Sequence, residues 1–286
     1  MWPFKRKLIV PVLRFSGTIG MATPLRAGLS LATSATAIER AFNLSKLPTV
    51  AIQINSPGGS PVQSSLIFKR IRQLAEEKKK RVYVFCEDVA ASGGYYLSIA
   101  GDEIYADACS IVGSIGVISS GFGFDKAIEK LGVERRVYTS GLSKGSLDPF
   151  VPEKAEDIER LKALQRDVHD VFIGVVKDRR AGKLTAPDSE LFSGAFWSAK
   201  QSLEFGLIDG ITDLRTKMRS LHGDKVRLVP VNMGGGSLLS RLRPSPASHG
   251  LGIGGGGLLP GLSVNGIGDE LVSTLEARAL WARFGL

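Results

Sequence analysis

Short apolar runs alternate with amphipathic segments over most of the chain. Residues 49–54 and 81–86 are mostly apolar and β-branched or aromatic, as expected of strands buried on both faces. Between them, apolar residues recur at helical spacing from Leu66 to Leu74, behind a capping Ser60 and a first-turn Pro61. This strand–helix–strand order predicts an α/β fold with a mostly parallel sheet flanked by helices.

The same rhythm predicts further elements downstream. We expect a helix after Gly94, short strands at 103–106 and 116–119, a helix at 124–131, a strand at 134–138 and a long charged helix at 153–180. Near the N-terminus, the apolar run 8–13 predicts an edge strand. Pro11 and Arg14 interrupt that run, so we expect neither an export signal nor a membrane-spanning helix there.

The pattern changes after Val231. Residues 232–268 are rich in glycine and carry only two charges, Arg241 and Arg243. Ordering so much glycine costs conformational entropy, so this segment is predicted to be a flexible linker. Residues 269–286 return to helical spacing. One apolar face of this helix is formed by Leu271, Leu275, Ala279 and Ala282, beside Val272 and Trp281. We therefore predict a domain over 1–231, a linker over 232–268 and a docking amphipathic helix over 269–286.

Composition narrows the class of protein. With 43% hydrophobic and 23% charged residues, the 286-residue chain is neither fibrous nor wholly disordered. A net charge of +9 favours an anionic neighbour such as a membrane surface. Basic and aromatic residues are not interleaved along the sequence, so nucleic-acid binding is not expected. Cys86 and Cys109 cannot build a disulfide framework or a zinc site. A reducing compartment, the cytoplasm, is expected, with peripheral membrane contact as an addition.

Two glycine-rich junctions follow predicted strands. The first is NSPGG at 55–59, where Gly58 and Gly59 would let backbone N–H groups face a ligand, as an oxyanion hole or a phosphate cradle. It lacks the Gly-Lys-Ser/Thr of a Walker loop and the spacing of a dinucleotide fingerprint. A simple tight turn is the alternative interpretation.

The second junction is ASGGY at 91–95, where Ser92 opens a helix. A serine in that position is either a helix N-cap or a nucleophile beside small residues that admit a substrate. The motif differs from the G-x-S-x-G elbow of the α/β-hydrolases.

A serine nucleophile needs a base, and the histidines are poorly placed to supply one. His169, His222 and His249 are expected on the solvated surface, so a Ser-His-Asp triad is disfavoured. Lysine replaces histidine in Ser-Lys enzymes when its surroundings disfavour the charged form. Lys144 lies among small neutral residues in TSGLSKGS (139–146), whereas most other lysines lie in charged runs. A solvated loop lysine is the alternative interpretation.

Four motifs in order now resemble a known family. They are NSPGG (55–59), ASGGYY (91–96), VGSIGV (112–117) and Ser140-Gly141-x-x-Lys144, and the stretch 196–209 agrees with them. Together they resemble the signal peptide peptidase A family, which includes SohB-like proteins. These are serine–lysine proteases with a ClpP/crotonase-like fold. The resemblance covers residues 8 to 231.

The resemblance assigns roles by position. It implies Ser92 as nucleophile, Lys144 as general base and Ser114 as the residue that orients the lysine. Gly58 or Gly59, with Gly93, would supply the oxyanion hole, and no metal or cofactor is implied. It also implies a homo-oligomeric ring in which the dyad is shared between subunits. Extended apolar peptides, such as signal-peptide remnants or segments of membrane-associated proteins, would be the substrates.

Two other functions remain open at this point. A crotonase-type acyl-CoA enzyme would use two backbone N–H groups on a thioester, but Ser92 and Lys144 would then have no role. A non-catalytic scaffold that binds peptides or membranes would explain the basic surface. Many relatives carry an N-terminal membrane anchor, which is not expected in this sequence.

Overall fold

A single twisted sheet runs through the molecule. The computed structural model describes residues 8–20, 28–141, 143–233 and 274–286. Within these residues the strands are β1 (Ile9–Ser16), β2 (Thr49–Ser56), β3 (Arg81–Ala91), β4 (Glu103–Ala106), β5 (Ile111–Gly113), β6 (Phe196–Ser198), β7 (Gly210–Ile211) and β8 (Arg227–Pro230). Their order is β6-β5-β3-β2-β1-β8, with β4 beside β3 and β7 beside β4. Every pair is parallel except β5 with β6.

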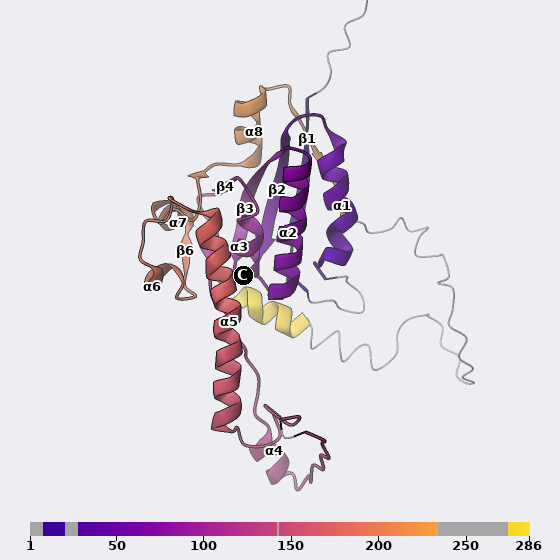
Figure 1. Cartoon of the computed structure of the whole chain (residues 1–286), viewed down its shortest axis with the longest axis vertical. Coiled ribbons are helices and arrows are strands. Elements are labelled where there is room, and N and C mark those ends of the chain that lie inside the picture. The colour runs from indigo at the N-terminus through magenta and orange to yellow at the C-terminus, as the bar shows by residue number, and fades with distance from the viewer. Residues whose placement is uncertain (1–7, 21–27, 142, 234–273) are drawn as a thin grey trace, which may run out of the picture.

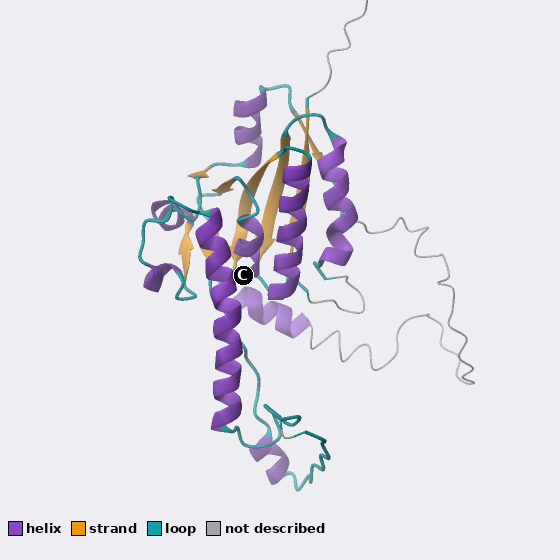
Figure 2. Cartoon of the chain, in the orientation of Figure 1, coloured by secondary structure: helices purple, strands orange, loops and turns teal. Residues whose placement is uncertain are grey.

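Helices flank this sheet, as Figure 2 shows in purple beside the orange strands. They are α1 (Leu31–Leu44), α2 (Pro61–Glu77), α3 (Gly93–Ser98), α4 (Asp125–Lys130), α5 (Ala155–Arg179), α6 (Asp188–Leu191), α7 (Ala199–Glu204) and α8 (Leu214–His222). The predicted fold class, a mostly parallel sheet flanked by helices, is confirmed.

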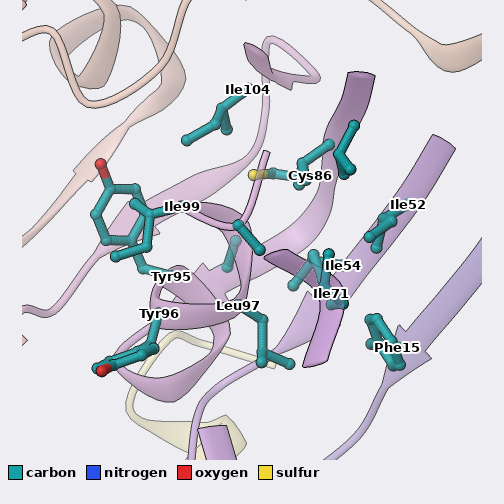
Figure 3. Close-up of a cluster of buried hydrophobic side chains, with 14 of the residues drawn as sticks. Phe15, Ile52, Ile54, Ile71, Cys86, Tyr95, Tyr96, Leu97, Ile99 and Ile104 are labelled. Atoms are coloured by element: carbon teal, nitrogen blue, oxygen red, sulfur yellow. The ribbon is translucent and has the colours of Figure 1, made fainter. Parts of the chain in front are cut away.

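The central strands are buried because helices cover both of their faces. Every residue of β2 except Gln53 is buried, which is why its sequence is an apolar run rather than an alternation. The larger core lies between the sheet and α1, α2 and α3, and Figure 3 shows Ile52, Ile54 and Ile71 within it. On the other face, Met218 of α8 packs against Tyr83 and its neighbours.

The N-terminal strand is not at the sheet edge. β1 pairs with β2 through Val12 and Ala51, and with β8 through Ile9 and Arg227. The edge-strand prediction for residues 8–13 was therefore wrong. A local pattern gave no warning, because the second neighbour, β8, comes more than 200 residues later in the chain.

Cys86 is a core residue, as its sequence position predicted. Its side chain is 3% exposed and lies in the main cluster (Figure 3). Burial raises the pKa of the Cys86 thiol to about 12, although a hydrogen bond between the Cys86 and Ser98 side chains acts to lower it. The thiol is therefore uncharged and unreactive near neutral pH.

A long projection, residues 117–171, leaves the main body; we call it the arm. It contains α4 and most of α5, and Figure 1 shows it extending below the sheet. None of its described residues is buried. The strands predicted at 116–119 and 134–138 are absent from it, because no other strand lies alongside to complete their hydrogen bonds.

The C-terminal residues fold back onto the body. Residues 274–282 form a helix, shown in yellow in Figure 1 where α5 leaves the body. Trp281 on this helix and Phe284 just after it pack against the body. The predicted contact is therefore confirmed at Trp281, but it was wrong for Leu275, Ala279 and Ala282, which are exposed. Leu271 and Val272 lie outside the described residues. The predicted linker, apart from residues 232 and 233, lies outside the described residues. No described helix is long and apolar enough to cross a membrane.

Candidate active site

Ser92 lies at a strained turn between β3 and α3. Its φ of 51° and ψ of −119° are conformations that residues other than glycine seldom adopt. Its backbone N–H donates to the Gly113 carbonyl oxygen at 2.8 Å, which fixes the turn against β5. The side chain makes no hydrogen bond to the helix N-terminus. Helix capping therefore does not explain Ser92, and its hydroxyl is available for chemistry.

The NSPGG turn brings the end of β2 against Ser92. Gly58 and Gly59 have φ values of 107° and 136°. A Cβ at Gly58 would lie 2.8 Å from the Ser92 Cβ, and a Cβ at Gly59 would collide with the Ile19 carbonyl oxygen. Only glycine fits this approach. The Gly58 N–H already donates to the Ser56 Oγ at 3.2 Å, whereas the Gly59 N–H makes no hydrogen bond among the described residues.

The two glycines after Ser92 let α3 approach its neighbours. A Cβ at Gly93 would lie 2.5 Å from the Ser64 Oγ on α2. A Cβ at Gly94 would collide with the Ser56 carbonyl oxygen. Both glycines are buried. The small residues of the ASGGY motif are therefore required for packing as well as for access to the serine.

Ser114 lies beside the serine turn through backbone pairing. β5 pairs with β3 in the register Ala91 to Gly113, so Ser92 and Ser114 each follow a paired position. Ser114 is 4% exposed, has a φ of 52°, and donates its N–H to the Ala195 carbonyl oxygen at 2.7 Å. The structure therefore brings Ser92, Gly58, Gly59, Gly93 and Ser114 to one end of the sheet.

A small pocket opens beside Ser92. Its volume is about 60 Å³, and its polar wall includes Ser92, Gly59 and Gly93. The rest of the wall is largely apolar and comes from α2, α3, the turn after β5 and α5: Pro61, Ser64, Ser65, Tyr96, Gly116, Val117, Val168, Val171 and Phe172. The pocket can hold a short apolar group next to the serine hydroxyl.

Lys144 lies apart from these residues, in the arm. Its side chain is exposed, and its backbone N–H donates to the Gly141 carbonyl oxygen at 3.2 Å. Nearby, Ser146 donates to Asp157 on α5 at 2.8 Å. Within the described residues, no hydrogen bond joins Lys144 to Ser92 or Ser114. A single chain thus assembles the serine half of the predicted site without the lysine half.

Comparison with known proteins identifies the family of this chain. The family model described as "Peptidase family S49" matches residues 74–226, which contain the serine turn and the whole arm. A protein of Synechocystis sp. named as a candidate protease is 32% identical over 80% of this chain and 81% of its own length. The chain belongs to peptidase family S49.

Two other relatives are longer than this chain. The chloroplastic serine protease SPPA of Arabidopsis thaliana is 31% identical over 82% of this chain and 34% of its own length. A Brucella abortus protein named Na(+)/H(+) antiporter NhaA is 53% identical over 97% of this chain. The chain spans 37% of that protein, so the antiporter name belongs to a much longer polypeptide.

The two described histidines of this S49 chain, His169 and His222, do not supply a base to Ser92. The His169 Nε2 contacts the Ile115 carbonyl oxygen at 3.0 Å, and within the described residues no histidine bonds Ser92. His222 is half-buried, and burial lowers its pKa. The expectation of solvated histidines was therefore wrong for these two, because α5 and α8 pack partly against the body. His249 lies outside the described residues.

A larger cleft, of about 440 Å³, lies away from the serine turn. Its carboxylates are engaged locally: Glu87 with Arg14 and Gln53, and Asp213 with Thr216. Ser92, Gly59 and Gly93 do not line it. Within the described ranges, no group of three His, Cys, Asp or Glu side chains is arranged to hold a metal ion. The smaller pocket, beside Ser92, is therefore the candidate active site.

The apolar wall contributed by α5 was missed by the sequence interpretation. Val168, Val171 and Phe172 recur at a helical spacing of three to four residues, but they lie in a helix that is otherwise charged. That spacing was the available signal. It did not identify which element the stripe would face.

Proposed function

We propose that this chain is a serine endopeptidase that hydrolyses extended apolar peptides with a Ser92–Lys144 dyad. The observation that carries the proposal is the position of the Ser92 hydroxyl. It lies on a strained turn, does not cap α3, and lines a pocket together with Gly59 and Gly93. Family membership supports the same class of reaction.

The reaction divides into two steps. The Ser92 Oγ attacks the peptide carbonyl carbon while its proton passes to the Lys144 amine. The C–N bond then breaks, the lysine returns the proton to the leaving amine, and an acyl-serine remains. Water, deprotonated by the same lysine, hydrolyses this ester and regenerates Ser92. In this scheme Ser114 accepts a hydrogen bond from the lysine ammonium and orients it.

We assign the oxyanion hole to the N–H groups of Gly59 and Gly93. Both residues line the pocket with Ser92, whereas Gly58 does not line it and its N–H is engaged by Ser56. Each donor aimed at a developing oxyanion is worth about 3 kcal/mol of transition-state stabilisation. Gly58 then has a packing role beneath the serine.

Lys144 is proposed to reach Ser92 of a neighbouring subunit in a homo-oligomeric ring. The arm has no buried described residue between 117 and 171, yet it exposes many large apolar side chains. They are Ile118, Phe122, Phe124, Leu131, Val133, Val137, Tyr138, Leu147, Val151, Leu164, Val168 and Val171. An apolar surface of this extent is typical of an interface between subunits. Burial there would disfavour the charged amine and make Lys144 a base.

The pocket supports a substrate with small apolar side chains. Its volume of about 60 Å³ is a few times the roughly 10–15 Å³ that a cavity needs to hold one water, which is room for a small side chain. Peptides rich in small apolar residues, such as remnants of signal peptides, fit this description. We further propose a cytoplasmic location and keep residues 1–231 as the peptidase domain.

Covalent labelling tests this proposal directly. The oligomeric protein is incubated with a fluorophosphonate and its intact mass is measured, for wild type, Ser92→Ala and Lys144→Ala, with Lys126→Ala as an exposed arm-lysine control. Labelling of wild type and Lys126→Ala alone is expected. Labelling of Lys144→Ala at the wild-type rate would contradict the base assignment. No labelling of folded wild type would contradict the peptidase and favour a scaffold or an acyl-CoA enzyme.

A further inference from the structure

The last residues of the chain pack against the underside of the serine strand. Phe284 is 8% exposed and clusters with Val89 and Ala91, with Trp281 and Ile111 packed alongside. The Phe284 and Phe196 rings meet edge to face, with centroids 5.0 Å apart and planes at 64°. Such aromatic pairs contribute beyond their area of burial.

The surface that receives Phe284 belongs to the three strands that build the site. Val89 and Ala91 end β3, immediately before Ser92. Ile111 begins β5, which leads to Ser114, and its partner strand β6 pairs Gly113 with Phe196. We call these four residues, Val89, Ala91, Ile111 and Phe196, the tail seat.

Among the described residues, no other helix covers the tail seat. On this face of the sheet, Met218 of α8 packs against Tyr83 and Phe85, nearer the start of β3. On the opposite face the serine strand is covered by α3 and the main core. β5 and β6 have three residues each, so few hydrogen bonds hold β5 to β3 and β6 to β5. Without Phe284, the strand ends beneath Ser92 would face water.

The strands at the tail seat carry backbone strain. Ser92 and Ser114 have φ values of 51° and 52°, a conformation that persists only where the surroundings hold it firmly. Their two turns are coupled through the hydrogen bond from the Ser92 N–H to the Gly113 carbonyl oxygen. A ring packed under both strands limits the ways in which this pair of turns can relax.

We propose that Phe284 is a positioning residue for the peptidase reaction, and that residues 281–286 are a buttress for the strand ends that carry Ser92 and Ser114. This inference rests on the proposed function. The buttress acts on the nucleophile through Val89 and Ala91 and does not touch the pocket that binds substrate. Loss of Phe284 is therefore expected to lower kcat and the labelling rate of Ser92 while leaving KM nearly unchanged.

The test uses full-length variants. Phe284→Ala, the conservative Phe284→Leu and the control Leu275→Ala, at a 57% exposed position of the helix that precedes Phe284, are compared with wild type. Circular dichroism and thermal melting establish that each is folded at the assay temperature. Fluorophosphonate labelling rates and kcat and KM on an apolar fluorogenic peptide are then measured. We expect about a tenfold loss of kcat and labelling rate in Phe284→Ala, partial recovery in Phe284→Leu and no change in Leu275→Ala.

Addition in trans provides a second measurement. A synthetic peptide with the wild-type sequence of residues 274–286 is added in excess to Phe284→Ala, and the labelling rate is expected to rise. Equal labelling of Phe284→Ala and wild type would overturn the buttress while leaving the peptidase intact. A rise in KM without loss of kcat would also overturn it. Absence of labelling in wild type would instead contradict the proposed function.

Discussion

The body of the molecule, meaning the described residues outside the arm, is packed much more tightly than the arm. In the body, β2 and β3 are almost wholly buried, and glycines allow backbone approaches that no other residue permits. In the arm, residues 117–171 include no buried described residue. The body holds Ser92 through its own contacts, whereas in the proposed shared dyad the arm would need a partner surface to fix Lys144. In that proposal, one chain carries two halves of a site that differ in how firmly they are held.

The largest expected effect is the recovery of peptidase activity when two inactive variants, one in the body and one in the arm, are combined. Ser92→Ala and Lys144→Ala should each lose nearly all peptidase activity, by a factor of about 10⁴ or more. If the dyad is shared between subunits, co-expression of the two restores activity to about a quarter of wild type, because random assembly leaves that share of sites with both residues intact.

Hydrolysis of an apolar fluorogenic peptide by the mixed assemblies measures this recovery. Co-expression of Ser92→Ala with the double variant, which lacks both side chains, is the matched control and should stay inactive. Failure of Ser92→Ala and Lys144→Ala to complement each other, in assemblies shown by mass to contain both, would place the dyad within one chain.

Gly58→Ala addresses the body alone. A Cβ there would meet the Ser92 Cβ at 2.8 Å and the Gly93 nitrogen at 2.9 Å, at a φ of 107°. Displacement of the serine turn by such a contact is expected to lower kcat about 100-fold. Gly121→Ala in the arm is the control, because no atom lies within 4 Å of its added Cβ. Steady-state kinetics measure kcat for both variants. An equal loss of kcat in Gly58→Ala and Gly121→Ala would show that the arm is as tightly constrained as the body.

The sequence predicted the body better than the arm for a physical reason. Buried parallel strands and glycine-rich turns impose local patterns, so 49–54, 81–86, Ser92 and the neighbouring glycines could be identified as candidates from short windows. A short strand in the arm has only a weak local criterion. Residues 116–119 and 134–138 each contain just one adjacent pair of β-branched or aromatic residues, Val117–Ile118 and Val137–Tyr138, and no described strand lies beside them.

Contacts between distant segments were the other limit. The β8 neighbour of β1, the α5 wall of the pocket and the Phe284 contact with β3 each join residues far apart in sequence. Amphipathic spacing indicates that a helix has an apolar face but not which surface receives it. That is why the terminal helix and the contact of Trp281 were predicted, whereas Leu275, Ala279 and Ala282 were wrongly placed in the contact face.

Asp209→Asn tests how firmly α5 is anchored to the body. Arg180, 2% exposed, donates to the Asp209 Oδ2 at 2.8 Å and to the Gly206 carbonyl oxygen at 2.6 Å. Lys183 donates to the same carboxylate at 2.6 Å. Removing one partner of a buried pair costs about 3 kcal/mol of unfolding free energy. Urea denaturation should show this loss, while the exposed arm pair variant Glu156→Gln should lose about 0.5 kcal/mol or less.

The same carboxylate gives the anchor a pH dependence. Burial acts to raise the pKa of Asp209, but hydrogen bonds from Arg180 and Lys183 outweigh it and lower the pKa below its ordinary value of 3.8. The stabilisation is therefore fully present above about pH 4 and is lost as the pH falls through the lowered value. Wild type should lose stability relative to Asp209→Asn below pH 3.8. If the melting temperatures of the two proteins fell equally with pH in this range, the result would contradict this prediction.

Gly174→Ala is the smallest expected change and examines the join between body and arm. Gly174 is an exposed position within α5, two residues beyond the buried Phe172, and no atom lies within 4 Å of an added Cβ. Alanine should raise the unfolding free energy by about 0.5–1 kcal/mol through helix propensity alone. If α5 is a rigid support for the arm, peptidase activity should not change. A stabilised variant with lower kcat would instead mean that bending of α5 at Gly174 moves Lys144 toward Ser92 during the reaction.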